Sequence, residues 1–199
     1  MAPRKSIVVL GGGVIGLTTA AVLSQAHDVK IIASKFGPDT ESVKATAIWH
    51  VYLVPETEIV LSWAETTLKK LIDIHAQYPQ AGIELIDGVE LFRKQSKNVP
   101  VWSTIPPRFE MLSEAEISEY SRHEHLAIGS TILTLCNEWP VKWGYRIRAP
   151  VAKMTTYLNW LMNLIVESGV KLERGTVADP ADTALSCDCV INCTGLGAR

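Results

Sequence analysis

The sequence predicts an α/β fold in which a parallel sheet is interrupted by a stretch of antiparallel character. Three observations predict this fold. Residues 5–34 contain a strand, a glycine-rich turn, a helix and a second strand, which together make a βαβ unit. The middle of the chain holds a run with apolar residues at every second position, which is typical of antiparallel strands. A helix and two short strands near the C-terminal end can then rejoin the parallel sheet.

The N-terminal βαβ unit is predicted from the order of apolar and small residues. Residues 5–10 (KSIVVL) hold a continuous apolar run, which is typical of a strand buried on both faces. A glycine-rich turn follows at 11–16, and the small residues of 17–27 predict a helix. Residues 28–34 (DVKIIAS) predict the second strand, and turn-forming residues fill the loop 36–47.

The middle of the chain begins with a long helix. Apolar residues at helical spacing predict an amphipathic helix from Glu56 to Tyr78, which ends before Pro79. Residues 82–93 carry apolar side chains at every second position. They therefore form either a pair of strands or one long strand bent at Asp87–Gly88.

A shorter helix and a further strand are expected after an irregular stretch. Ser113 and Glu116 have the spacing of a capping box, which predicts a helix through Tyr120. Residues 130–136 (STILTLC) are a strand candidate, and residues 138–148 are interpreted as rich in turns.

The C-terminal part of the sequence returns to the pattern of the parallel sheet. Pro150 suits the first position of a helix that runs through Ile165, and Gly169 suits the position just past its end. Residues 170–174 and 187–195 are expected to be strands. We therefore predict a dinucleotide-binding domain in two parts, with a partial second domain inserted between them. The three stretches are residues 1–55, 56–144 and 145–199.

Composition and charge exclude several classes of protein. The net charge of −2 gives no basic surface for nucleic acid, which usually needs a strongly basic domain. No apolar run approaches the roughly 18 residues of a membrane span. Glycines interrupt the place where a signal peptide needs its apolar core, so we expect an intracellular protein.

The cysteines and histidines give no clear metal motif. Cys187, Cys189 and Cys193 have a spacing that a metal site could use, but no histidine lies near them in the sequence. We interpret them as buried free thiols of a reducing compartment. His123 and His125 form a weaker candidate pair, which is more typical of a surface turn. We therefore predict no bound metal ion.

Gly11, Gly13 and Gly16 carry the strongest functional signal, because their G-x-G-x-x-G spacing lies between a strand and a helix. In this context the first glycine allows a tight turn, the second lets the backbone approach a pyrophosphate, and the third lets the helix pack closely on the strand. The pyrophosphate is expected at the start of the helix, beside Val14 and Ile15, where N–H groups and the helix dipole favour an anion.

The end of the second strand departs from the usual dinucleotide pattern. An acidic residue is expected there to bind the ribose hydroxyls, but the sequence reads Ile32-Ala33-Ser34-Lys35. Ser34 can hydrogen-bond a ribose hydroxyl, and Lys35 can meet a phosphate. Because a basic residue here also suits a 2′-phosphate, NADP remains an alternative cofactor.

Several segments together make the chain resemble the D-amino-acid oxidase and D-aspartate oxidase family. The resemblance is carried by VVLGGGVIGLTTA, IIASKF, ATAIWHVYLVP, YLNWL and VINCTGLGAR. It implies a Rossmann-like sheet that binds FAD, interrupted by the start of an antiparallel substrate domain. It also implies that Ala47 and Ile48, just before Trp49, face the isoalloxazine ring, and that the backbone of Val177 meets the adenine.

The resemblance extends to a second dinucleotide motif and to a reaction. Cys193, Thr194 and Gly195 match the place where the chain of family members passes close to the cofactor, so Thr194 and Gly195 are expected to contact it. The implied reaction is the oxidative deamination of D-amino acids to 2-oxo acids, with ammonia and hydrogen peroxide as the other products. The implied substrate is therefore a D-amino acid.

The chain is short for this family. The arginine and tyrosines that hold the substrate carboxylate in family members lie after the point where this sequence stops, so we assign no catalytic residue. Arg146, Tyr145 and Arg148 are interpreted as a solvated strand edge rather than a substitute clamp. We expect a truncated product that forms a homodimer or needs a second half, and that has no oxidase activity alone. Peroxisomal and cytoplasmic locations both stay open.

Three alternative functions remain at this point. The chain can be an NADP-dependent enzyme, a glycine-oxidase-like flavoprotein, or a nucleotide-binding remnant without catalysis. His50 follows the predicted flavin-side Trp49 and can lie near a substrate, although a packing role is more common for such a histidine.

Overall fold

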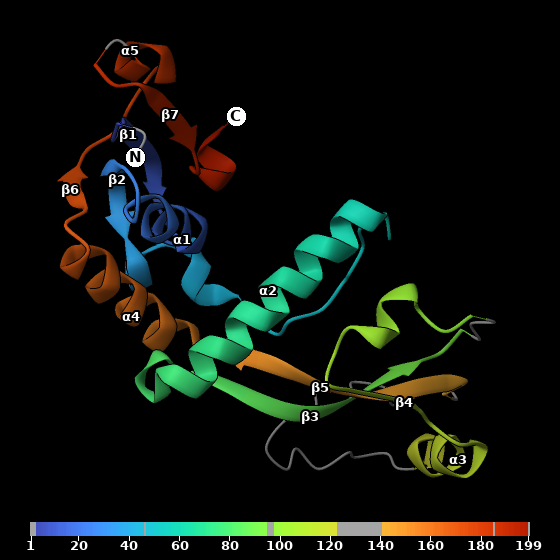
Figure 1. The fold of residues 1–199 in the computed structure, drawn as a ribbon. Helices are drawn as coiled ribbons and strands as arrows, with labels where there is room; N and C mark the ends of the chain where they lie inside the picture. The colour runs from blue at the N-terminus through green and yellow to red at the C-terminus, as the bar shows by residue number, and fades with distance from the viewer. Residues whose placement is uncertain (1–2, 46, 95–97, 123–140, 185, 199) are drawn as a thin grey trace. The chain divides into compact units, whose positions relative to one another are not determined.

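The computed structural model describes residues 3–45, 47–94, 98–122, 141–184 and 186–198, and it confirms the predicted pairing of a parallel with an antiparallel sheet (Figure 1). The chain divides into two compact units. The first comprises Met1–Ala47, Gln80–Gly82 and Ala152–Arg199, and the second comprises Ile48–Pro79 and Ile83–Val151. The chain thus leaves the first unit after Ala47, returns to it briefly at Gln80–Gly82, and rejoins it at Ala152.

The first unit is built on a four-stranded parallel sheet with the order β6-β2-β1-β7. The strands are β1 (Ser6–Gly12), β2 (Asp28–Phe36), β6 (Lys171–Arg174) and β7 (Cys189–Asn192). The apolar run Ile7–Leu10 is buried, as expected for an inner strand of a parallel sheet. The four predicted strands of this sheet are therefore confirmed.

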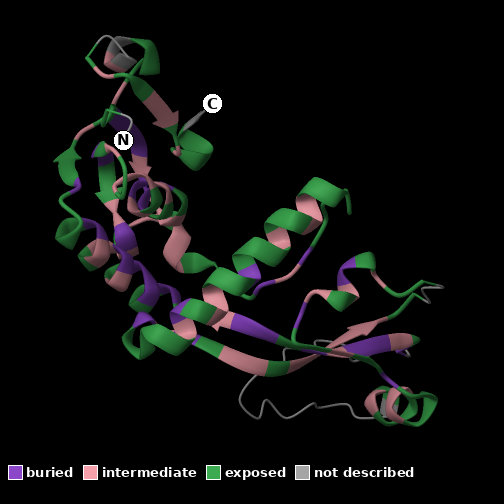
Figure 2. Cartoon of the chain, viewed as in Figure 1, coloured by how far each residue is buried: buried purple, intermediate pink, exposed green. Residues whose placement is uncertain are grey.

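Two helices that pack against each other belong to this unit: α1 (Val14–Leu23) and α4 (Met154–Glu167). The helix α4 buries a stripe of side chains at helical spacing, visible in Figure 2, namely Met154, Tyr157, Leu158, Leu161 and Ile165. The prediction that this helix begins at Pro150 is wrong, because Pro150 lies in strand β5 and the helix begins at Met154. On the β4 side of that strand, Pro150 lies past Arg148, the last residue that pairs with β4, so its missing N–H breaks no bond to β4.

The other face of the parallel sheet carries a small apolar cluster. Val8, Leu10 and Ile32 are buried there, and Val177, Cys187 and Val190 pack against them. The connection from β6 to β7 supplies Val177 and Cys187, and it includes the short helix α5 (Pro180–Ala184). Short 3₁₀ turns complete the described structure, at Gly37–Asp39, Glu41–Lys44, Pro79–Ala81, Val101–Thr104 and Gly195–Ala198.

The second unit is built on a three-stranded sheet with the order β3-β5-β4. Its strands are β3 (Ile83–Phe92), β4 (Arg108–Met111) and β5 (Trp143–Ala152). The strand β3 is continuous, which decides between the two predicted arrangements of residues 82–93 in favour of one long strand. The interpretation of residues 138–148 as turn-rich is wrong for residues 143–148, because they form the inner strand β5.

Two helices of the second unit begin at side-chain caps, of which the second was predicted. The helix α2 (Glu58–Gln77) starts at Thr57, whose side chain accepts a hydrogen bond from the Val60 amide at 3.4 Å. The helix α3 (Glu114–Arg122) has the predicted capping box, in which the Ser113 amide donates to Glu116 at 2.8 Å. The core beside the sheet is aromatic, with Trp49 and Trp102 buried edge to face at 6.2 Å between ring centroids.

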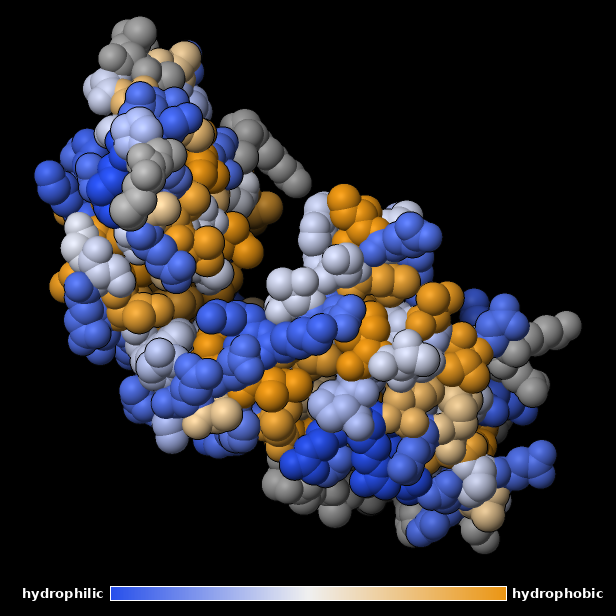
Figure 3. Space-filling model, in the orientation of Figure 1, coloured by the Kyte–Doolittle hydropathy of each residue, from blue (hydrophilic) through white to orange (hydrophobic). Residues whose placement is uncertain are grey.

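Apolar side chains also gather on the surface of the second unit around the start of α2 (Figure 3). Tyr52, Leu53, Ile59 and Trp63 are exposed there. The strand candidate 130–136 and the pair His123 and His125 lie outside the described residues. Within the described part of the chain, no helix combines the length and the apolar character needed to cross a membrane.

Candidate functional site

The turn from β1 into α1 depends on glycine at two of the predicted positions. Gly11 has φ +109°, and a Cβ atom there would lie 2.4 Å from the backbone oxygen of Cys193. A Cβ atom on Gly16 would lie 1.9 Å from the backbone oxygen of Gly11. Both distances are shorter than any real carbon–oxygen contact, so larger residues would force α1 away from β1 and β7. The first turn of α1 is therefore held directly over the ends of these strands.

A cavity of about 660 Å³ opens beside this turn, at the carboxyl ends of β1, β2 and β7. The chain runs from β1 to β2 on one side of β1, while β7 lies on its other side. The cavity therefore lies where the strand order reverses, which is the usual place of ligand binding in an open parallel sheet. Most predicted site residues line it: Gly11, Gly13, Val14, Ile15, Ser34, Lys35, Val177, Thr194 and Gly195.

The start of α1 presents a positive helix end to the cavity. The first turn of α1 contains no acidic residue, and Gly13 at the N-cap has no side chain. The Val14 amide instead donates a hydrogen bond to the Ser42 hydroxyl at 3.0 Å. Thr40 and Ser42 both line the cavity, although sequence reasoning did not assign them to the site. Their hydroxyl groups add polar contacts beside the helix dipole.

The end of β2 supplies two exposed side chains, Ser34 and Lys35, at the cavity. A carboxylate also lines the cavity, because Glu41 reaches it from the loop after β2. The Lys44 ammonium lies 2.6 Å from this carboxylate, and its hydrogen bond and charge lower the pKa of Glu41. An ionised carboxylate is therefore present in the cavity, although the strand end where one was expected has none.

The segment after β7 closes the cavity from the other side. The side chain of Asn192 accepts hydrogen bonds from the Thr194 amide at 3.1 Å and from the Thr194 hydroxyl at 2.7 Å. Gly195 follows with φ +60°, a conformation that favours glycine. Val177 lines the cavity and also packs against the apolar cluster of the sheet.

Ala47 and Ile48 are not among the residues that line this cavity. They lie where the chain passes from the first unit to the second. The Ala47 carbonyl accepts a hydrogen bond from the Ala152 amide at 2.8 Å, and Ile48 forms a β-bridge with Val151. Trp49 is buried in the second unit, and its indole N–H donates to the Ala64 carbonyl at 2.9 Å.

The second unit contains a separate ionisable cluster of His50, Glu90 and Tyr145. The Nε2 atom of His50 lies 2.8 Å from Oε2 of Glu90 and 3.0 Å from the Tyr145 hydroxyl, which itself donates to Glu90. Burial raises the pKa of Glu90, but the hydrogen bonds from His50 and Tyr145 outweigh it, so the pKa is lowered. Burial and the contact with Glu90 raise the pKa of Tyr145. The cluster therefore holds one ionised carboxylate between two donors.

The prediction of buried thiols is wrong for the three cysteines near β7. Cys189 is exposed, and Cys187 and Cys193 are half-buried. They differ from the expected burial because β7 is the last strand of the described sheet, where one side lacks a neighbouring strand. Among the residues whose placement is described, no three His, Cys, Asp or Glu side chains form a group that could hold a metal ion.

Comparisons with known proteins agree with this geometry. The family model described as FAD dependent oxidoreductase matches residues 6–199. A D-amino-acid oxidase from Rubrobacter xylanophilus is 31% identical over 193 residues, which cover 96% of this chain and 53% of that protein. A D-aspartate oxidase from Homo sapiens is 31% identical over 201 residues, which cover 97% of this chain and 54% of that protein.

Solved structures show the same fold at lower identity. Glycine oxidase from Geobacillus kaustophilus superposes with a TM-score of 0.61 at 16% identity, over 88% of this chain and 48% of that one. L-α-glycerophosphate oxidase from Mycoplasma pneumoniae, a structure with FAD bound, gives a TM-score of 0.59 at 13% identity, over 89% of this chain and 46% of that one. The chain spans about half the length of the curated relatives it matches. It belongs to the FAD-dependent oxidoreductase family, and this confirms the predicted family.

Proposed function

We propose that this member of the FAD-dependent oxidoreductase family provides the FAD-binding part of an oxidase that acts on D-amino acids. One observation carries the proposal: the cavity beside Gly11–Gly16 lies at the point where the strand order of the sheet reverses. Known relatives named D-amino-acid oxidase and D-aspartate oxidase support the substrate class.

The residues of the cavity fit a dinucleotide pyrophosphate. The start of α1 has no acidic side chain that would repel an anion, and its dipole favours negative charge. Gly11 cannot carry a side chain, and Gly13 brings bare backbone to the cavity wall. Thr40 and Ser42 line the same wall with hydroxyl groups. This set would hold the pyrophosphate against the helix end.

The remaining lining residues fit the two ends of the same molecule. Ser34 and the ionised Glu41 offer acceptors for ribose hydroxyls, and Val177 offers an apolar wall for adenine. Lys35 would meet a phosphate oxygen. Thr194 and Gly195 would lie along the cofactor where the segment after β7 passes it, and we assign Ala47 and Ile48 to its flavin end from the family resemblance.

The proposed activity is the oxidative deamination of D-amino acids. FAD, when bound, would accept a hydride from the amino-acid α-carbon and pass the two electrons to oxygen, which gives hydrogen peroxide. The imino acid left behind is hydrolysed by water to a 2-oxo acid and ammonia. In this arrangement the chain's own residues bind and orient. We assign no side chain of this chain to proton transfer.

A charge placed at the start of α1 tests the cofactor site. Ile15 lines the cavity and is 65% exposed, so Ile15→Glu keeps the fold and puts a carboxylate beside the pyrophosphate. Val22→Glu is the matched control, because Val22 is 60% exposed on the same helix but about 10 Å further along its axis. An acid in the first turn stabilises a helix, so weaker binding by Ile15→Glu cannot come from a lost helix.

Flavin fluorescence, followed while each variant is titrated into FAD, measures FAD binding, and NADP added as a competitor gives its relative affinity. We expect the full chain to bind FAD more tightly than NADP, Ile15→Glu to bind FAD about tenfold more weakly, and Val22→Glu to match the wild type. Equal binding by Ile15→Glu and Val22→Glu, or a preference for NADP, would contradict the proposed site. Because no oxidase activity is expected of this chain alone, the substrate class is tested with the chain combined with a second half. Without oxygen, D-amino acids but not L-amino acids should then bleach the bound flavin.

A further inference from the structure

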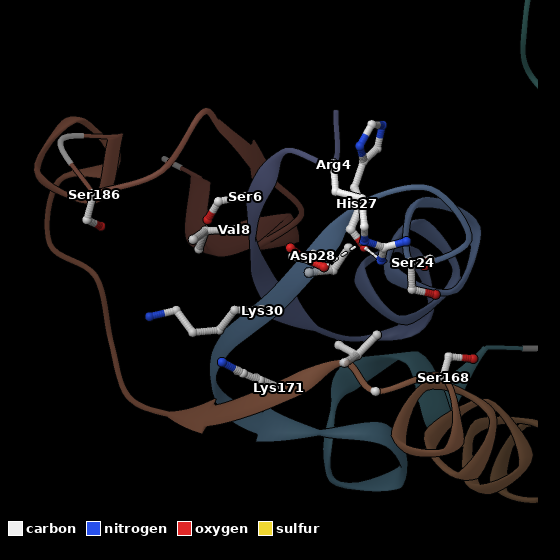
Figure 4. Close-up of a pocket in the computed structure, with 13 residues that line it drawn as sticks. Arg4, Ser6, Val8, Ser24, His27, Asp28, Lys30, Ser168, Lys171 and Ser186 are labelled. Carbon is white, nitrogen blue, oxygen red and sulfur yellow. Dashed lines mark hydrogen bonds and ion pairs between the residues drawn. The ribbon is translucent and has the colours of Figure 1, made fainter. Parts of the chain in front are cut away.

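A second cavity, of about 460 Å³, lies in the first unit at the opposite ends of its strands (Figure 4). Its lining includes Ser6, Lys30 and Lys171, which lie at or near the first residues of β1, β2 and β6. Val8 forms part of the wall, and Ser186 joins from the connection before β7. No residue of this cavity lines the dinucleotide cavity, so the two are separate sites on one sheet.

The sheet places two lysines side by side in this cavity. Val8 pairs with Lys30, and Lys30 pairs with Lys171, so the three side chains form one row across β1, β2 and β6. Figure 4 shows both lysine side chains extending from the sheet in the same direction. A parallel sheet is normally apolar on both faces, and like charges directly opposite each other are destabilising. Lys171 is exposed on the outermost strand β6, so the pair tolerates this repulsion, and a nearby negative charge would relieve it.

The acids nearby compensate only one of the two lysines. Glu173 lies two residues further along β6, and its carboxylate is 3.0 Å from the Lys30 ammonium. Asp28 is held by Arg4 at 2.8 Å. In the part of the chain that the structure describes, Lys171 has no ion-pair partner.

The Arg4 guanidinium, which also lines the cavity, already has hydrogen-bond partners. Arg4 donates to the carbonyls of Ser24 and His27 as well as to Asp28, which fastens the starts of β1 and β2 together. The nearby Asp188 accepts the Ser6 amide at 2.8 Å. These contacts leave the Lys171 ammonium, and the two remaining N–H groups of Lys30, as the donors available to a ligand.

We propose that this cavity binds a phosphate group, either free or carried by a small polar molecule. A phosphate brings the negative charge that the lysine pair lacks, and a lysine ammonium binds it as a point charge. The Ser6 hydroxyl lines the same space and can donate to a phosphate oxygen (Figure 4). The Ser168 and Ser186 hydroxyls also line it, but they already donate to the carbonyls of Leu164 at 2.7 Å and Thr183 at 3.0 Å. A cavity of this size also has room for a short hydroxylated carbon chain on the phosphate.

The substitution Lys171→Gln should raise the stability of the free chain and weaken phosphate binding. A loss of binding therefore cannot be explained by a loss of folding. Without ligand, the substitution removes the repulsion with Lys30, so the melting temperature should rise by about 1–2 °C. With phosphate, it removes the main charge of the site, so affinity should fall about tenfold. Lys5→Gln is the matched control, since it removes an exposed charge near the start of β1 and Lys5 does not line the cavity.

Calorimetric titrations of the 199-residue chain with inorganic phosphate, glycerol 3-phosphate and glycerol identify the ligand. We expect the wild type and Lys5→Gln to bind the two phosphates, Lys171→Gln to bind both about tenfold more weakly, and glycerol to give no heat. Tighter binding of one phosphate shows whether the free ion or the phosphorylated molecule is preferred.

The Ile15→Glu variant keeps this test independent of the dinucleotide site. If phosphate binding disappears in Ile15→Glu but persists in Lys171→Gln, the phosphate occupies the other cavity and the inference fails. It fails equally if the wild type binds neither phosphate. Retained phosphate binding in Ile15→Glu supports the inference even if FAD does not bind.

Discussion

Removing one hydroxyl from the cluster in the second unit should destabilise that unit measurably. Tyr145 is 1% exposed, and its hydroxyl donates to the Glu90 carboxylate that also contacts His50. The substitution Tyr145→Phe keeps the ring, which packs against Trp102 and Phe109. It removes the hydrogen bond to Glu90 together with the 3.0 Å contact between the hydroxyl and Nε2 of His50. It therefore measures what the hydroxyl contributes through its contacts with Glu90 and His50.

The magnitude follows from the environment of Glu90. A hydrogen bond to a charged group contributes about 1.5–3 kcal/mol to stability. The Glu90 side chain is 33% exposed, so water replaces part of the lost bond. His50 also remains 2.8 Å away to hold the carboxylate. We therefore expect Tyr145→Phe to lower the free energy of unfolding by about 1–2 kcal/mol at pH 7.

Urea unfolding is followed by tryptophan fluorescence and by far-UV circular dichroism. Fluorescence reports mainly on the second unit, because Trp160 is the one tryptophan of the sequence outside it, and circular dichroism reports on both units. Tyr157→Phe is the matched control. Tyr157 is 7% exposed in the first unit, and the described structure gives its hydroxyl no hydrogen-bond partner. We expect this control to lose less than about 0.5 kcal/mol, because it removes a hydroxyl without breaking a bond.

The effect of Tyr145→Phe should also depend on pH with a defined sign. The folded-state pKa of Glu90 is lowered, so its contribution to stability is present above its unfolded pKa and is lost as the pH falls through the folded pKa. Without the Tyr145 hydroxyl, that folded pKa moves upward and the loss begins at a higher pH. If Tyr145→Phe is as stable as the control Tyr157→Phe at pH 7, the Tyr145 hydroxyl does not stabilise the second unit and the reasoning is refuted.

Three further substitutions test other parts of the structure. Leu158→Ala removes a side chain with 0% exposure from α4, so we expect urea unfolding followed by far-UV circular dichroism to show a loss of about 3–4 kcal/mol. Ser42→Ala removes the acceptor of the Val14 amide, which should cost about 1 kcal/mol at the start of α1 and weaken FAD binding in a fluorescence titration. Glu116 should titrate in carboxyl NMR spectra with a pKa of about 2, because Ser113 and Arg146 bind its charged form. The cap of α3 should therefore persist as the pH falls to about 2, and Glu116→Gln should remove that dependence.

Features that depend on neighbouring residues in the sequence could be predicted. The turn at Gly11–Gly16 and the capping box of Ser113 and Glu116 are both short-range, so their spacing alone determines the local geometry. The cap of α1 by Ser42 could not be predicted, because Ser42 is 28 residues away from Val14 and meets it only after β2 has paired with β1. The position of Glu41 at the cavity could not be predicted for the same reason.

The strand β5 has alternating burial, but its sequence did not lead to the prediction of a strand. Tyr145 is buried while Arg146 and Arg148 are not, which is the alternation of a strand with one solvated face. Turn-forming residues before it and Pro150 after it obscured this alternation in the sequence.

The same strand explains why two arginines in this part of the chain are poorly suited to bind a substrate carboxylate. Arg146 lies 2.6 Å from the carboxylate of Glu116, and Arg148 lies 2.9 Å from that of Asp87. Each guanidinium would have to give up an ion pair within the second unit before it could bind another carboxylate. A substrate carboxylate would therefore take the place of Glu116 or Asp87 beside the arginine. The ion pair gained would only offset the ion pair lost, so neither arginine offers a net gain in binding free energy. The contrast with Lys171, which has no such partner in the described structure, is the physical reason for placing an anion at the lysine pair.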